Sequence, residues 1–325
     1  MNPRAQSQPR RFAFTATGLL ASASVVQADE GGMSFWLPGE FGSFAAAPAA
    51  PGWSLPVLNY YADVDEDTDK YFPRGGRVTA GVSDFTWLLF VSPTYTFPAP
   101  VLGGQAAVSL GGALGSTHLH IGATLSGPAG SVLTGSETDS LTGVSDLYPL
   151  FTLKWNRGVH NWMAYTMWGA PVGDYDVDRL ANLGTNHWSA DFGGGYTYLD
   201  QKLGQEFSAA LGFTYNFENH DTNYRNGVDV HLDIAASKIV SPKFHVGVVG
   251  YAYQQVSGDS GSGAVLGSFK SKVFGFGPQA GWFFEVGREK WYLNLKGFYE
   301  WGSENRPEGW NVWLTLAIPL TETKQ

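Results

Sequence analysis

The chain has 325 residues and a net charge of -9, with 43% hydrophobic, 15% aromatic and only 15% charged residues, whereas soluble domains carry about 25% charged residues. The negative charge argues against nucleic-acid binding, and the lack of cysteine excludes disulfides, thiolate metal sites and cysteine nucleophiles. The 42 glycines and the many aromatic residues are typical of membrane-embedded strands, and one closed sheet can use the whole length.

The first 28 residues have the pattern of an export signal. Arginines at positions 4, 10 and 11 precede an apolar, uncharged stretch at residues 12–26. Val26 and Ala28 then place small residues at the −3 and −1 positions before Asp29. We therefore predict a signal peptide at 1–28 that is cleaved after Ala28. A membrane anchor is the alternative, but its apolar run is shorter than the roughly 20 residues that a helix needs to span a bilayer.

Residues 29–52 do not alternate in polarity and are rich in glycine, alanine and proline. They nevertheless carry four large aromatic residues, and leaving such side chains in water is unfavourable by about 1.5–3 kcal/mol each. We predict that this N-terminal segment folds into the lumen of a barrel as a plug; the alternative is a periplasmic tail that only begins the first strand. The plug candidates are Phe35, Trp36, Phe41 and Phe44.

Residues 53–320 alternate between apolar and small or polar residues, the period-two pattern of strands. Phe207, Leu211 and Phe213, for example, alternate with Ser208 and Thr214. Long segments of this kind predict an all-β fold, a transmembrane antiparallel β-barrel of about 12 strands. A soluble β-sandwich is the alternative, but its strands are usually about five or six residues long. The strands are expected near 53–64, 83–97, 104–115, 141–155, 159–170, 187–199, 205–217, 227–239, 243–256, 271–285, 290–302 and 309–320, followed by a C-terminal tail at 321–325.

Every second connection between these strands is short, which is the pattern of periplasmic turns and longer extracellular loops. Within 104–140 two questions stay open: Gly111–Thr117 is a bulge or a break, and His118–Ser126 continues the strand or forms a loop. The short turns are expected at 156–158, 200–204, 241–243 and 287–290, and the long loops at 65–82, 171–186, 218–226 and 257–270.

Several motifs in the chain resemble those of the family known as putative MetA-pathway phenol degradation proteins, and the resemblance spans most of 29–320. It implies an outer-membrane transporter-like barrel that passes small apolar or aromatic molecules. The motifs are Glu30-Gly-Gly-x-Ser-Phe-Trp-Leu-Pro-Gly-x-Phe-Gly-Ser, Ala170-Pro-Val-Gly-Asp-Tyr175, Arg179-Leu-Ala-Asn182 with Asn186-His-Trp188, Asn216-Phe-Glu-Asn219, Gly250-Tyr-x-Tyr-Gln-Gln255 with Gly258-Asp-Ser-Gly-x-Gly263, and Glu304-Asn-Arg-Pro-x-Gly-Trp310.

Extending the alternation places a set of charged residues on the lumen face, since a Lys or Arg facing lipid at mid-bilayer would cost about 2–4 kcal/mol. These residues form either a constriction that selects solutes or a network that fills a narrow barrel. Arg179 and Asn182, in a long loop, either gate entry or order the loop. Tyr251, Tyr253, Gln254 and Gln255 either stack a solute or belong to an aromatic girdle. The lumen candidates are Asp84, Asp146, Lys154, Asp191, Glu206, Asp229, His231, Asp233, Lys296 and Glu300.

Enzyme and metal chemistry have weak sequence support. His187 and Ser189 share a strand face, but no nucleophile motif accompanies them. His118 and His120 share a face as well, but no third metal ligand has a clear spacing. We expect no catalytic residues, no metal site and no cofactor.

The sequence therefore predicts a monomeric outer-membrane channel for passive uptake of small apolar or aromatic compounds, whose partners are outer-membrane lipid and the solute. A structural or adhesive surface barrel that binds a partner through its extracellular loops is the alternative, and an outer-membrane hydrolase comes third. The sequence does not identify the solute.

Overall fold

The computed structural model describes residues 34–71, 77–126, 132–265 and 267–321, and within them the side chains of all residues except 67–80 and 125. The predicted signal peptide at 1–28 lies outside the described residues, as does most of the predicted tail at 321–325. Among the described residues, no helix is long and apolar enough to cross a membrane.

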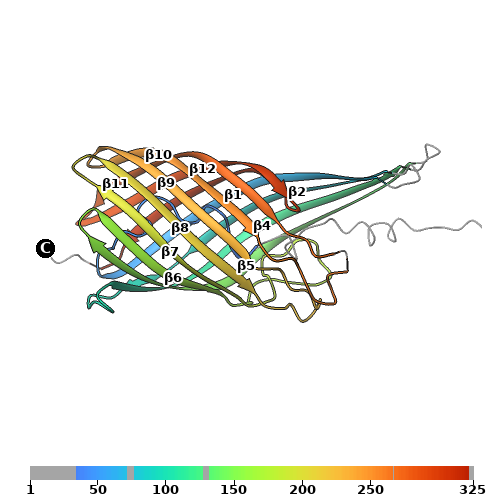
Figure 1. Ribbon diagram of the computed structural model, residues 1–325, viewed down its shortest axis with the longest axis horizontal. Coiled ribbons are helices and arrows are strands. Elements are labelled where there is room, and N and C mark those ends of the chain that lie inside the picture. The colour runs from blue at the N-terminus through green and yellow to red at the C-terminus, as the bar shows by residue number, and fades with distance from the viewer. Residues whose placement is uncertain (1–33, 72–76, 127–131, 266, 322–325) are drawn as a thin grey trace, which may run out of the picture.

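The described residues form one closed antiparallel sheet (Figure 1). From β4 to β13 each strand pairs with the next one in sequence, β2 and β3 each pair with β1 and β4, and β13 pairs with β1 to close the ring. The strands are β1 (Gly52–Tyr71), β2 (Arg77–Val91), β3 (Thr94–Thr96), β4 (Gln105–Ser126), β5 (Val132–Arg157), β6 (His160–Gly169), β7 (Ser189–Asp200), β8 (Gln205–Asn216), β9 (Asp229–Ser241), β10 (Phe244–Gln255), β11 (Lys272–Val286), β12 (Glu289–Glu304) and β13 (Glu308–Pro319).

The 13 strands occupy twelve positions around the barrel, because β2 and β3 lie end to end between β1 and β4. Ser92 and Pro93 separate the two, where proline cannot donate a ladder hydrogen bond. This confirms the predicted all-β antiparallel barrel and its strand number. The four short turns are also confirmed, at 158–159, 201–204, 242–243 and 287–288.

The predicted loop at 65–82 is wrong. β1 and β2 pair continuously from Asp65↔Ser83 to Tyr71↔Arg77, so the aspartate-rich stretch belongs to a hairpin. Aspartates are depleted in strands, so the stretch resembles a loop in sequence, but the backbone pairing is continuous through it. β5 likewise begins at Val132 instead of 141, and residues 118–126 continue β4. The register between β4 and β5 shifts between Gly112 and Leu114, which supports the bulge interpretation.

The exposure of side chains follows the predicted alternation. Along β8, Phe207, Leu211 and Phe213 are exposed on the outer surface, whereas Ser208 and Thr214 are buried inside. A continuous outer belt of exposed apolar side chains cannot be accommodated in water without cost, but it matches the lipid-facing surface of a membrane barrel.

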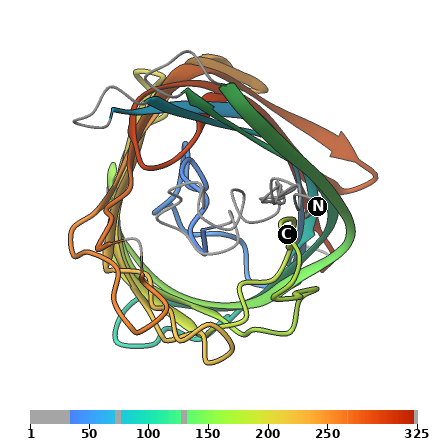
Figure 2. The ribbon, with the colours of Figure 1, turned by 90° about the vertical axis from the view of Figure 1, so that its right-hand side faces the viewer.

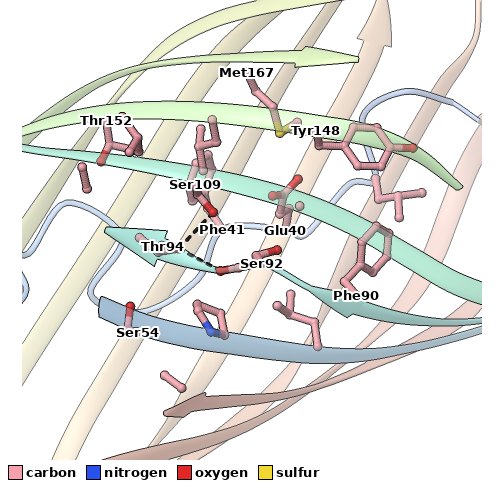
Figure 3. Close-up of a pocket in the computed structure, with 18 of the residues that line it drawn as sticks. Glu40, Phe41, Ser54, Phe90, Ser92, Thr94, Ser109, Tyr148, Thr152 and Met167 are labelled. Carbon is pink, nitrogen blue, oxygen red and sulfur yellow. Dashed lines mark hydrogen bonds between the residues drawn. The ribbon is translucent and has the colours of Figure 1, made fainter. Parts of the chain in front are cut away.

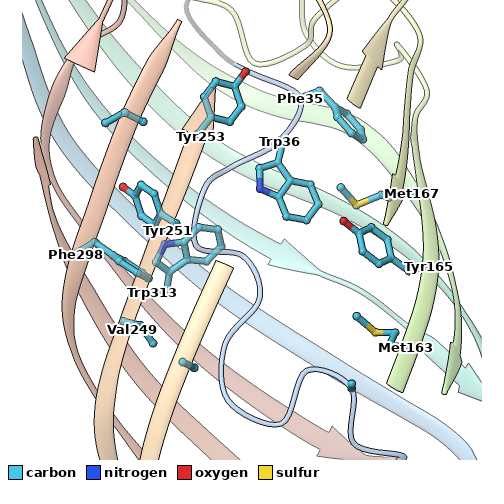
Figure 4. Close-up of a cluster of buried hydrophobic side chains, with 13 residues drawn as sticks. Phe35, Trp36, Met163, Tyr165, Met167, Val249, Tyr251, Tyr253, Phe298 and Trp313 are labelled. Atoms are coloured by element: carbon cyan, nitrogen blue, oxygen red, sulfur yellow. The ribbon is translucent and has the colours of Figure 1, made fainter. Parts of the chain in front are cut away.

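Part of the chain runs inside the barrel, as the blue segment within the ring in Figure 2 shows. Residues 34–47, here called the inner segment, run inside the ring and contact side chains from β7, β8, β9, β11 and β12. Trp36 of this segment is 1% exposed and lies in a buried cluster with Tyr165, Tyr251 and Trp313 (Figure 4). The hydrophobic core of the protein is therefore formed jointly by the wall and the inner segment.

Candidate functional site

The inner segment turns at Pro38 and Gly39, a pair typical of a type II turn. Gly39 has φ +89°, and a Cβ atom there would lie 2.9 Å from the ring of Phe298, so the position requires glycine on both counts. The turn directs the backbone amides of residues 39 and 41 toward the same side of the barrel. The close fit against the wall follows from this local geometry.

Two charged wall residues hold the turn. Asp233 on β9 accepts hydrogen bonds from the amides of Gly39, at 2.9 Å, and Phe41, at 3.0 Å. Lys296 on β12 donates to the carbonyl oxygens of Gly39, Glu40 and Phe41, the last two at 2.8 and 3.4 Å. Hydrogen bonds to charged groups are stronger than neutral ones, so residues 39–41 form the most firmly held part of the segment.

A second set of contacts holds residues 43–46. Glu206 on β8 accepts hydrogen bonds from Ser43 Oγ at 2.7 Å and from the Phe44 amide at 3.1 Å. Ser43 Oγ also lies 2.8 Å from Ser237 Oγ on β9. The amide of Ala46 donates to Thr197 Oγ1 on β7 at 3.0 Å. Backbone groups that would otherwise lie buried without partners are thus satisfied by the wall.

Trp36 packs against the wall through its ring. Its indole stacks on the imidazole of His231, with centroids 3.6 Å apart and planes 16° from parallel. The His231 ring is fixed by a 2.8 Å contact between its Nε2 and Asp191 Oδ2, and Thr214 donates to the same oxygen at 2.6 Å. Trp36 and His231 therefore form a stack that Asp191 holds in place, and this stack adds an anchor to the polar contacts of the inner segment.

The other predicted lumen carboxylates bind the wall itself or a loop. Asp84 accepts from Thr117 at 2.8 Å, and Asp229 accepts from Asn216 at 2.9 Å. Asp146 accepts from the backbone amides of Val172, Gly173 and Thr185, and Glu300 accepts from Tyr251 and Asn311. The described contacts of these residues tie strands and loops together and do not hold the inner segment.

The two loop candidates contact β5 and their own loop. Arg179 donates two hydrogen bonds to Asp139, at 2.8 and 3.1 Å, and holds the pKa of that carboxyl at about 2. Asn182 accepts from the Asp176 amide at 2.9 Å. Asp139 lies on the part of β5 that extends beyond the ring. The contacts fix the loop at 170–188 over one side of the barrel mouth.

The barrel contains a cavity of about 390 Å³ between the inner segment and the wall of β1 to β6 (Figure 3). Its lining is mainly apolar, with Leu88, Phe90, Tyr148, Leu150, Met163 and Met167. Glu40 of the inner segment and Lys154 of β5 provide the charged groups. The sequence prediction included Lys154 but missed Glu40, because the segment has no periodic pattern that marks which side chains face inward.

The candidate enzyme and metal residues occupy unremarkable positions. Ser189 Oγ lies 3.3 Å from His187 Nδ1, but it donates to Asn216 Oδ1 at 2.9 Å and is fully buried in the wall. His118 and His120 contact Ser140 and Thr138 on an exposed face. Within the described residues, no group of three or more His, Asp or Glu side chains is arranged to hold a metal ion.

Comparison with known proteins supports this architecture. A family model with the description "Putative MetA-pathway of phenol degradation" matches residues 63–316. The chain is similar to the COG4313 outer membrane channel from Pseudomonas putida F1, with 15% identity and a TM-score of 0.57 over 87% of this chain and 99% of that one. At this identity the likeness shows the fold, which is that of an outer-membrane channel. No curated protein sequence matches the chain.

Two further solved structures are more distant. A BenF-like porin from Pseudomonas fluorescens Pf-5 has 11% identity and a TM-score of 0.32, over 83% of this chain and 98% of that one. Pseudomonas aeruginosa OpdK with vanillate has 10% identity and a TM-score of 0.32, over 82% and 98%. TM-scores this low carry no structural argument.

Proposed function

The chain belongs to the family described as "Putative MetA-pathway of phenol degradation", as its motifs predicted, and we propose that it is a channel for passive uptake of small apolar or aromatic compounds across the bacterial outer membrane. In this proposal the export signal at 1–28 is cleaved after Ala28, and the mature protein acts as a monomer. The driving force is the concentration gradient of the solute. No cofactor takes part.

The inner segment is the plug of this channel. The observation that carries the proposal is the way the segment is held: its contacts with Asp233, Lys296 and Glu206 are hydrogen bonds, which water can replace when the segment leaves. Its aromatic rings, by contrast, lie against wall residues such as His231 and Tyr165, where an apolar solute can compete for the same surface. Restricted passage of small solutes follows, rather than a wide aqueous pore.

The apolar cavity supports the solute class. Its volume of about 390 Å³ is within the range of about 300–1,000 Å³ that is typical of small-molecule sites, and its walls present aromatic and aliphatic side chains. The solved structure with the similar fold is described as an outer membrane channel, which is compatible with uptake of a solute here.

Single-channel conductance of refolded residues 29–325 in a planar bilayer tests the proposal, beside a variant that lacks 29–52. We expect discrete, infrequent steps from the longer protein and larger, sustained steps from the truncated one. Silence from both proteins would refute a diffusion channel. Equal steps from both would refute the plug while leaving the channel in place.

A surface-binding barrel is the second candidate, and the extension of four strands past the ring favours it. β1, β2, β4 and β5 continue well beyond their neighbours (Figure 1). An adhesin would lose partner binding when the β4–β5 hairpin is shortened and would be silent in the bilayer. A channel would keep its conductance after the same change.

A further inference from the structure

The two lysines inside the barrel have different surroundings. Lys296 donates to three carbonyl oxygens of the inner segment and lies near Asp233 and Glu40. Lys154 donates to one, the carbonyl oxygen of Ala47, at 3.2 Å. Within the described part of the chain, no carboxylate lies within 4.0 Å of the Lys154 ammonium. Lys154 is partly buried and faces a mainly apolar cavity, where an unpaired ammonium is less well solvated than in bulk water, so this position suits an anion.

Lys154 stands at one end of the cavity, and the wall becomes apolar away from it. From Lys154, the side chains of β5 that line the cavity are, in order, Thr152, Leu150 and Tyr148, with the small Ser145 beyond them. At roughly 3.3 Å per residue, the backbone from Lys154 to Tyr148 spans about 20 Å. β3 and β2, which pair with β4 on the side away from β5, show the same change in character: β3 contributes Thr94 and Thr96, and β2 contributes Leu88 and Phe90 (Figure 3).

The change from a polar to an apolar lining along the cavity indicates the shape and polarity of a ligand that would fit there. A cavity of about 150 Å³ holds benzene, so one of about 390 Å³ accommodates a ring together with a short chain and a head group. An ammonium and several hydroxyl groups at one end suit a carboxylate, whose two oxygens accept hydrogen bonds. The apolar end suits the ring or the alkyl chain.

We propose that the cavity between the inner segment and β1 to β6 is a binding site for amphipathic monocarboxylates, with Lys154 as the counter-ion of the carboxylate and the Phe90–Tyr148–Leu150 wall as the apolar subsite. The inference rests on the proposed channel function, because it names the class of solute that pauses in the channel. The ligand should carry a single negative charge, because one ammonium group, that of Lys154, lines the polar end of the cavity.

Glu40 is compatible with a bound anion. Its carboxyl group makes no hydrogen bond with the described residues, and burial together with the nearby Asp233 raises its pKa to about 7, against the opposing effect of Lys296. Near neutral pH a large share of the Glu40 side chains is therefore uncharged. It lines the cavity together with Phe41 of the inner segment and Tyr148 of the wall, and its uncharged form can donate a hydrogen bond to a ring substituent.

Isothermal titration calorimetry of the detergent-solubilised full chain tests the site, with 3-phenylpropanoate and its uncharged counterpart 3-phenylpropanol as probes at pH 7.5. We expect the acid to bind at least tenfold more tightly than the alcohol, in line with a charge-assisted hydrogen bond. Lys154→Met should abolish this preference and leave alcohol binding unchanged, whereas Lys154→Arg should retain it. Equal affinity of the wild-type protein for the two probes would overturn the proposal.

Lys238→Met is the matched control. Lys238 on β9 also donates to one backbone carbonyl, that of Leu203 at 2.7 Å, but it is exposed on the outer surface. The control should bind the acid as tightly as the wild type does. If both variants lost the preference for the acid, the cause would be the net charge of the protein, and the proposed site would be refuted. Conductance of the same preparations separates the two proposals: silent bilayers would refute the channel, while the calorimetric preference would still decide the carboxylate site.

Discussion

Replacing Asp233 by asparagine should release the inner segment while leaving the barrel wall intact. The carboxylate accepts two backbone hydrogen bonds, from the amides of Gly39 and Phe41 at 2.9 and 3.0 Å. Hydrogen bonds to a charged group contribute about 1.5–3 kcal/mol each, and a neutral asparagine can accept one bond worth about 0.5–1.5 kcal/mol. The difference is about 1.5–5.5 kcal/mol, and because water reaches a vacated lumen we take a value below the middle of this range, about 3 kcal/mol.

A loss of about 3 kcal/mol favours the released state by about 100-fold, since each 1.4 kcal/mol is tenfold. Single-channel recording of Asp233→Asn should therefore show open events that occupy about 100 times more of the recording than in the wild type, up to saturation. Conductance per event should stay the same, because the lumen itself is unchanged.

The control is Asp84→Asn. Asp84 also faces inward, but it accepts from Thr86 and Thr117 on the wall and has no described contact with the inner segment. Its open fraction should match that of the wild type. An Asp233→Asn protein with the same open fraction as both would refute the view that this clamp holds the channel closed.

Two further predictions concern the stack and the loop. Trp36→Ala removes the ring that stacks on His231 and should destabilise the held segment by about 3–5 kcal/mol, the usual cost of such a truncation. Hydrogen exchange should then accelerate at residues 34–47 but not in β8, and an unchanged rate at 34–47 would count against the stack as an anchor. The Arg179–Asp139 contact should hold the 170–188 loop at neutral pH and fail in acid, because the pKa of Asp139 falls from 3.8 in the free state to about 2 in the folded one. A carboxyl group whose pKa is lower in the folded state stabilises that state at pH values above its free pKa. This stabilisation is lost as the pH falls through the pKa of the folded state. The anisotropy of a fluorophore on Val177→Cys, attached to a chain that has no other cysteine, should be constant from pH 8 to 5 and fall between about pH 4 and 2. Arg179→Gln should show low anisotropy throughout, and a change between pH 8 and 5 in the parent would rule out this carboxyl as the cause.

The period-two alternation was sufficient to predict most of the wall. The outer face of a membrane strand contacts lipid and requires apolar side chains, whereas the inner face contacts protein or water and accepts polar ones. Successive residues such as Phe207 and Ser208 can therefore be assigned to opposite faces from the sequence. The alternation failed at 65–82, where an aspartate-rich sequence resembles a loop although β1 and β2 stay paired through it. The twelve positions were counted correctly, because β2 and β3 read as one strand across Pro93.

The contacts inside the barrel could not be predicted from the alternation. Asp233 and Lys296 were expected to face inward, but their partners are backbone atoms of the inner segment, which have no sequence signature. Glu40 was missed because its orientation depends on the turn at Pro38 and Gly39 and not on a repeating pattern. The role of Gly212 was also missed from the sequence. A Cβ atom there would lie 2.2 Å from the hydroxyl of Tyr165, so the position of Tyr165 in the aromatic cluster requires glycine at 212.

A reversible lock on the inner segment tests the central proposal most directly. Ser43 and Ser237 have hydroxyl oxygens 2.8 Å apart, so cysteines at both positions are close enough to form a disulfide with its bond of about 2.05 Å. No native cysteine competes, because the chain has none. We predict that the oxidised Ser43→Cys/Ser237→Cys protein is silent in a planar bilayer and that a reductant restores wild-type events in the same recording. Identical conductance before and after reduction would contradict the proposal that solutes pass when this segment moves.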